Sequence, residues 1–168
     1  MQVVRHLNKK EDYMKKPNPE YIERIKQLVN NSPYFSLLSM KILDMGIGYS
    51  HLEIDIGKKH LQPFGLVHGG VFASIIDAAA FWAIYYDIKD QNDGATTVDL
   101  KLNYLAPALS GKLVAKGRRI KLGKTLGYAE AEVQSETGKI LAHGTSTVMI
   151  QLGKGLVADP PLPSKFLD

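Results

Sequence analysis

The sequence predicts an α+β fold in which a mainly antiparallel sheet wraps around one long helix, and three observations lead to this prediction. Of the 168 residues, 45% are hydrophobic, which suits one domain with its own core. Residues 68–86 form an almost unbroken apolar run with the length of a long helix. Segments with strand-like alternation lie before and after this run without a repeated strand–helix–strand order, which argues against a doubly wound parallel sheet.

The segment before the long helix is predicted to contain a shorter helix and a β-hairpin. Residues 18–31 are expected to be helical because Asn18 can cap the first turn and Pro19 suits the first helical position. This helix stops at Ser32-Pro33, and its apolar stripe consists of Ile22, Ile25, Leu28 and Val29. Residues 40–45 and 49–57 flank two glycines, and the second segment alternates with a period of two, as in a hairpin.

Four strands are predicted after the long helix, at residues 96–106, 112–122, 125–135 and 139–152. Alternation in the first of them places four apolar side chains on one face, namely Val98, Leu100, Leu102 and Tyr104. The chain therefore divides into an N-terminal arm and helix (1–33, with 1–17 expected to be mobile), a main domain (34–152) and a flexible Pro-rich tail (153–168).

Composition argues against several classes of protein. The net charge of +4 comes without the clustered basic residues of a nucleic-acid-binding protein, and no cysteine is available for a disulfide, a thiolate zinc site or a nucleophile. The histidines lack metal-ligand spacing, so no metal site is expected. The N-terminus lacks an apolar signal segment, and a charge at the centre of the long apolar run would cost about 3 kcal/mol in a bilayer. We therefore predict a cytoplasmic protein without a membrane span.

The long apolar run contains a single charged residue, Asp77. Because an unpaired buried carboxylate is costly, this side chain is either partly exposed, hydrogen-bonded, or placed there for chemistry. The helix begins at His68-Gly69-Gly70, where no Ser, Thr, Asn or Asp is available as a cap. Its free N–H groups could face a developing negative charge, or the two glycines could serve tight packing against the sheet.

Three segments of the sequence, in order, carry a family resemblance. They are "LQPFGLVHGGVFASIIDAAAFWAIYY" (61–86), "TTVDLKLNYLAPA" (96–108) and "GKTLGYAEAEVQSETGKILAHGTSTVMI" (123–150). Together they resemble the hotdog-fold acyl-CoA thioesterases, and within them the phenylacetate-degradation and hydroxybenzoyl-CoA thioesterase group. The resemblance covers roughly residues 34–152 and implies that an acyl- or aryl-CoA thioester is hydrolysed to the free acid and CoA.

The resemblance implies roles for five residues. Asp77 stands where the family has an Asp or Glu on the central helix, as nucleophile or general base. Gln62 stands where the family has an Asn or Gln, six residues before His68, and is expected next to Asp77 in a site that another chain completes. The backbone N–H of Gly69 would polarise the thioester carbonyl, with His68 beside it in the site. Thr97 matches the Ser or Thr that assists the carboxylate in one branch; in another branch that residue lies one turn after the helix carboxylate.

The resemblance also implies two segments that bind coenzyme A, within residues 104–108 and 121–126. The two lysines of the second segment would meet phosphates, although their residue types alone suit a solvated strand end equally well. The implied residues are Tyr104, Pro107, Lys121, Gly123, Lys124 and Thr125. No separate cofactor is expected, because CoA is part of the substrate. The expected partners are an acyl-CoA and further copies of the chain, in at least a dimer and, by the resemblance, a dimer of dimers.

Two chemical routes stay open at this point. Water activated by Asp77 can attack the thioester carbonyl, or Asp77 can attack directly to give a mixed anhydride. Two other functions also remain: a hotdog hydratase or dehydratase that acts on acyl thioesters, and a non-catalytic acyl-CoA-binding protein.

Overall fold

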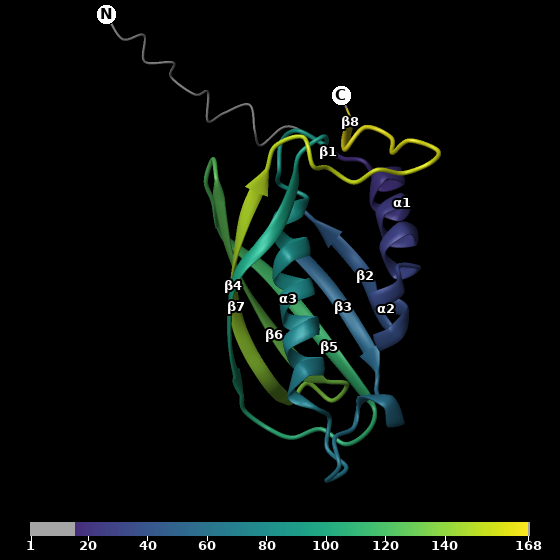
Figure 1. Ribbon diagram of the computed structural model, residues 1–168, viewed down its shortest axis with the longest axis vertical. Helices are drawn as coiled ribbons and strands as arrows, with labels where there is room; N and C mark the ends of the chain where they lie inside the picture. Colours follow the sequence, from purple (N-terminus) through teal and green to yellow (C-terminus); the bar gives the residue numbers. More distant parts are fainter. Residues whose placement is uncertain (1–15, 168) are drawn as a thin grey trace, which may run out of the picture.

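A six-stranded antiparallel sheet curves around one long helix in the computed structural model, which describes residues 16–167 (Figure 1). The strand order is β2-β3-β5-β6-β7-β4. The strands are β2 (Met40–Gly46), β3 (Tyr49–Asp55), β4 (Gly94–Tyr104), β5 (Lys112–Leu122), β6 (Leu126–Ser135) and β7 (Ile140–Gln151). The predicted α+β class and the hotdog arrangement are confirmed, whereas the arm predicted over residues 1–17 lies almost wholly outside the described residues.

The central helix, α3 (Gly69–Tyr85), is apolar on most sides because the sheet curves around it. Gly117 of β5 approaches the helix so closely that a Cβ there would lie 2.1 Å from the Ala79 carbonyl oxygen. The Ser50 hydroxyl of β3 donates to the same oxygen at 2.6 Å. The middle of α3 is thus fixed against β3 and β5. Within residues 16–167, no helix has the length and apolar character needed to cross a membrane.

The first long helix, α1 (Pro19–Asn30), begins as predicted, with the Asn18 side chain accepting a hydrogen bond from the Glu20 N–H at 3.0 Å. Its buried side chains are Tyr21, Ile25 and Val29. Leu28 is 38% exposed, so its assignment to the buried stripe is wrong. Tyr21 belongs to the buried set instead, because its ring packs edge-on against Tyr86 at the end of α3.

The two edges of the sheet differ in how they are covered. At the β2 edge, the Asn30 side chain donates to the Ile42 carbonyl at 3.1 Å and accepts from the Ile42 N–H at 2.8 Å. This pairing and α1 protect the edge from association with another strand. At the other edge lies β4, and none of the described residues forms a strand beside its outer side.

A second short helix, α2 (Pro33–Leu38), follows α1 and was not predicted. Ser32-Pro33, interpreted only as the stop of α1, is also the N-cap and first position of α2. Ser39 ends α2 in a left-handed conformation, with φ of 50°, and the chain then enters β2. The two helices therefore turn the chain so that α2 lies beside the central helix.

The C-terminal segment is docked at its end, so the prediction of a flexible tail is wrong for residues 165–167. Lys165 is 3% exposed, and its ammonium donates to the carbonyls of Tyr85 and Ile88, at 2.8 Å each. These carbonyls lie at the end of α3, where the helix leaves backbone acceptors unpaired and favours a cation. The two-residue strand β8 (Phe166–Leu167) pairs with β1 (Lys16–Pro17) and completes the attachment.

Candidate active site

Asp77 lies half-buried near the middle of α3 and faces β4. Its Oδ1 accepts a hydrogen bond from the Thr97 hydroxyl at 2.8 Å, so the structure brings these two predicted residues together. Burial raises the pKa of the Asp77 carboxyl, and the hydrogen bond from Thr97 counteracts part of this rise. A raised pKa makes the ionised carboxylate a stronger base, which is typical of a group that accepts a proton during a reaction.

A β-bulge in β4 is the reason that Thr97 reaches Asp77. The pairing of β4 with β7 shifts between Thr97 and Asp99, and Val98 is the extra residue. In a regular strand Thr97 and Leu100 would point to opposite faces, but here one contacts Asp77 and the other lines the same pocket. Val98 is 52% exposed, so its predicted place on the inner face is wrong, because alternation does not continue through a bulge.

The start of α3 is capped, in contrast to the prediction. The His68 Nδ1 atom accepts a hydrogen bond from the Gly70 N–H at 2.8 Å. The Tyr104 hydroxyl donates to the Gly69 carbonyl at 3.2 Å, and a Cβ at Gly69 would lie 2.8 Å from that hydroxyl. Among the described residues, none accepts a hydrogen bond from the Gly69 N–H. The first turn therefore still offers one N–H to an acceptor from outside.

The predicted catalytic residues form two groups in one chain. Gly69 precedes Asp77 by eight residues on α3, which corresponds to about 12 Å along the helix axis. The Gly69 N–H points toward the start of the helix and thus away from Asp77. Gln62 lies in the loop before α3, where its side-chain oxygen accepts a hydrogen bond from the Phe64 N–H. Gln62 thus lies near the start of the helix, with His68 and Gly69, and its predicted place next to Asp77, in a site that another chain completes, stays a prediction.

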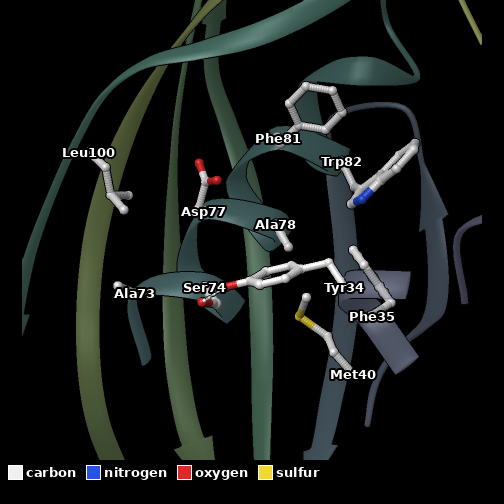
Figure 2. Close-up of a pocket in the computed structure, with 10 residues that line it drawn as sticks. All are labelled: Tyr34, Phe35, Met40, Ala73, Ser74, Asp77, Ala78, Phe81, Trp82 and Leu100. Atoms are coloured by element: carbon white, nitrogen blue, oxygen red, sulfur yellow. Dashed lines mark hydrogen bonds between the residues drawn. The ribbon is translucent and has the colours of Figure 1, made fainter. Parts of the chain in front are cut away.

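A pocket of about 410 Å³ lies beside Asp77, on the side of α3 that faces α2 (Figure 2). Asp77 and Leu100 lie on one side of the view, and Tyr34 and Phe35 of α2 lie on the other. Apart from Asp77, its polar side-chain groups include the hydroxyls of Tyr34 and Ser74, which form a hydrogen bond of 2.7 Å. The arrangement is that of a small apolar cavity with one carboxylate in its wall, which suits an apolar organic group next to a hydrolysable bond.

The residues implied in CoA binding lie at opposite ends of α3. Tyr104 and Pro107 lie near its start, as the contact of Tyr104 with Gly69 demonstrates. The other group forms the turn between β5 and β6, near the last turn of α3, where Gly127 packs against Ile84. All six residues are exposed; Lys121 lies at the end of β5, and Gly123, Lys124 and Thr125 lie in the turn. Within one chain, the two segments therefore do not form a single binding site.

Sequence reasoning missed the contribution of α2 to the pocket. Tyr34 and Phe35 line it, but they lie in a segment for which no element was predicted. The available signal was Ser32-Pro33, since a Ser followed by Pro starts a helix as well as ending one. Ser74 was recognisable as one of few polar residues of the central helix, although nothing in the sequence indicates its contact with Tyr34.

Comparison with known proteins places the chain in one family. Residues 64–142 match the Thioesterase superfamily. A protein of Halobacterium salinarum, provisionally named an esterase, is 30% identical over 135 residues, which cover 78% of this chain and 87% of the relative. Acyl-coenzyme A thioesterase 13 of Mus musculus is 29% identical over 97 residues, which cover 56% of this chain and 68% of the relative.

A solved structure agrees with these sequence matches. A thioesterase from Haemophilus influenzae superposes with a TM-score of 0.71 at 25% sequence identity, over 77% of this chain and 89% of that chain. The sequence resemblance to hotdog thioesterases is therefore confirmed in both sequence and fold. The chain belongs to the thioesterase superfamily, and it is a thioester hydrolase.

Proposed function

We propose that the chain hydrolyses acyl-CoA thioesters and that Asp77 is the catalytic base or nucleophile. The observation that carries this proposal is the Asp77 carboxylate itself, which is half-buried, bonded to Thr97 and set in the wall of an apolar pocket. An apolar pocket suits the hydrocarbon part of an acyl group, and the carboxylate suits attack on the carbonyl at the mouth of that pocket. The name of the mouse relative, an acyl-coenzyme A thioesterase, and the resemblance of the sequence support an acyl-CoA as the substrate.

In the general-base route, the water oxygen attacks the thioester carbonyl carbon while Asp77 takes a proton from the water. The carbonyl oxygen becomes an oxyanion and accepts a hydrogen bond from the Gly69 N–H at the start of α3. When this intermediate collapses, the carbon–sulfur bond breaks, and the CoA sulfur leaves as a thiolate and takes up a proton. In the covalent route, the Asp77 carboxylate attacks the carbonyl itself, the carbon–sulfur bond breaks, and the CoA thiolate leaves and takes up a proton; water then hydrolyses the mixed anhydride to the free acid and regenerates the Asp77 carboxylate.

The separation of Gly69 and Asp77 favours a site that two chains complete together. The Gly69 N–H points away from Asp77. A carbonyl group bound at that N–H therefore lies more than about 12 Å from Asp77 of the same chain, measured along the axis of α3. A second chain related by a two-fold axis would bring its own Asp77 to this carbonyl. The uncovered β4 edge, with the exposed Val98, is the surface of the sheet available for such an association.

We expect the purified protein to be at least a dimer at micromolar concentration, because the β4 edge lacks cover from the described part of the chain. Light scattering coupled to size-exclusion chromatography measures the mass directly. A stable monomer of 18.6 kDa that still hydrolyses thioesters would contradict the two-chain site.

Lys121 and Lys124 are expected to recognise the phosphates of CoA. Both are exposed and flank the β5–β6 turn, so removal of one charge should raise KM for an acyl-CoA by a factor that corresponds to about 1 kcal/mol or less, with kcat nearly unchanged. A truncated thioester without the nucleotide should be unaffected by Lys121→Ala or Lys124→Ala. Lys139→Ala, at the exposed β6–β7 turn, serves as the control of equal charge. An unchanged KM in the double variant would refute this location for the CoA phosphates.

The experiment that tests the proposed function is a panel of acyl-CoA substrates with release of free thiol as the readout. The panel contains aryl, short, medium and long acyl groups. Saturable thiol release from at least one of them is expected. If no acyl-CoA releases thiol although a simple thioester does, then the assignment of CoA as the thiol carrier is wrong.

A further inference from the structure

Tyr34 of α2 spans the side of the pocket opposite Leu100, with its ring directed toward α3 (Figure 2). Its hydroxyl lies 2.7 Å from the Ser74 hydroxyl. The Ser74 hydroxyl donates to the Gly70 carbonyl at 2.8 Å, so its hydrogen is already committed. The Tyr34 hydroxyl must therefore be the donor to Ser74, and the two bonds form a chain from α2 to the first turn of α3.

The hydrogen bond to Ser74 holds Tyr34 in place more than packing does. Tyr34 is 55% exposed, whereas its neighbour Phe35 is partly buried against the core. A side chain with so much free surface has little packing to fix its rotamer, so the bond to Ser74 selects the position in which the ring crosses the pocket. Phe35 anchors α2 through its contacts with the core, whereas the ring of Tyr34 is held mainly by the hydrogen bond to Ser74.

The pocket that Tyr34 helps to enclose is small. Its volume of about 410 Å³ lies near the lower end of the range for ligand pockets, roughly 300–1,000 Å³. Its wall is formed by apolar side chains such as Met40, Trp82 and Leu100, and no lysine or arginine lines it. An uncharged hydrocarbon group of limited length fits such a space, and Tyr34 stands at the side away from Leu100.

We infer that Tyr34 determines specificity by setting the longest acyl group that the pocket accepts. The hydrogen bond to Ser74 holds the Tyr34 ring in its position across the pocket. This inference rests on the proposed function, because it takes the pocket beside Asp77 as the acyl site. Short acyl groups bind with the ring in place, and longer ones must displace it and break the bond to Ser74.

The test measures binding, so it does not depend on turnover. The ligands are S-alkyl-CoA thioethers with butyl, octyl and dodecyl chains, which lack the hydrolysable carbonyl, and calorimetry gives each Kd. Tyr34→Ala is expected to bind the dodecyl ligand about tenfold more tightly than the wild type, because more of the chain is buried, and to bind the butyl ligand with little change. Tyr34→Phe and Ser74→Ala should each shift the ratio of the dodecyl Kd to the butyl Kd in the same direction by a smaller factor. In these two variants the aromatic ring stays, but the hydrogen bond between residues 34 and 74 is lost.

Leu37→Ala is the matched control, since Leu37 is 63% exposed on the same helix and is not among the residues that line the pocket. It should leave the ratio at the wild-type value. A ratio that stays unchanged in Tyr34→Ala, while the ligands still bind, overturns the inference and leaves the proposed function standing. A wild-type protein that binds none of the three thioethers overturns both.

Discussion

Asp77→Asn is expected to lower kcat for thioester hydrolysis by about 10²-fold or more, because an amide neither takes a proton from water nor attacks a carbonyl. The amide has nearly the same shape and can still accept the hydrogen bond from Thr97, so the fold should be retained. Asp99→Asn removes an exposed carboxylate two residues after Thr97 and serves as the control. Steady-state kinetics with thiol release gives both values. An Asp77→Asn enzyme with wild-type kcat would rule out a chemical role for this side chain.

A Thr97 variant tests the role of the Asp77 carboxylate in a second way, through the pH dependence of kcat/KM. Asp77 must be ionised to act, so kcat/KM should rise with pH through its pKa. Burial raises the pKa of Asp77, and the hydrogen bond from Thr97 lowers it. Thr97→Val should therefore raise this pKa further, so that the rise of kcat/KM with pH begins at a higher pH. A purely structural role of Thr97 would change stability without moving this rise.

Lys165 is expected to make stability rise with pH in the alkaline range. Burial lowers the pKa of its ammonium to about 8. Between pH 8 and the ordinary lysine pKa near 10.4, the unfolded chain therefore binds more protons than the folded chain, and the free energy of unfolding increases with pH. From pH 7 to 9.5 this group should contribute an increase of about 2 kcal/mol.

Urea unfolding at several pH values, with Lys165→Met beside the wild type, measures this contribution. The variant should lack the increase, and the tyrosines around Lys165 contribute equally to both proteins. Lys154→Met removes an exposed lysine of the same C-terminal segment and should behave as the wild type does. Identical pH dependence in the wild type and Lys165→Met would mean that the ammonium is not buried at the end of α3.

Much of the fold could be predicted because local chemistry and tertiary structure agree. Asn18 and Pro19 specify the start of α1, and the alternation of Leu52 and Ile54 specifies β3. The α2 helix was missed because Ser32-Pro33 signals an end and a beginning at once. The docked end of the tail was missed because nothing in its Pro-rich composition indicates that Lys165 donates to the Tyr85 and Ile88 carbonyls at the end of α3.

The candidate site was predicted in its residues and less well in its geometry. The bond between Thr97 and Asp77 depends on a bulge at Val98, and a strand pattern with a period of two contains no sign of an inserted residue. The pocket depends on α2 lying beside α3, which neither segment specifies alone. The separation of Gly69 from Asp77 within one chain follows from the helix rise and was already contained in the sequence.

In the proposed site, the Gly69 N–H of one chain and the Asp77 carboxylate of another act on the same carbonyl, and dimers that combine two variants distinguish this site from one formed within a single chain. Gly69→Pro removes the N–H at the first position of the helix, where proline is tolerated. Gly69→Pro and Asp77→Asn chains carry different affinity tags, are co-expressed, and the mixed dimers are purified through both tags. Each parent should be nearly inactive, whereas the mixed dimer should recover about half of the wild-type kcat, because one of its two sites then draws both intact groups from different chains. If the two groups act within one chain, the mixed dimer stays as inactive as its parents, and that result would contradict the account.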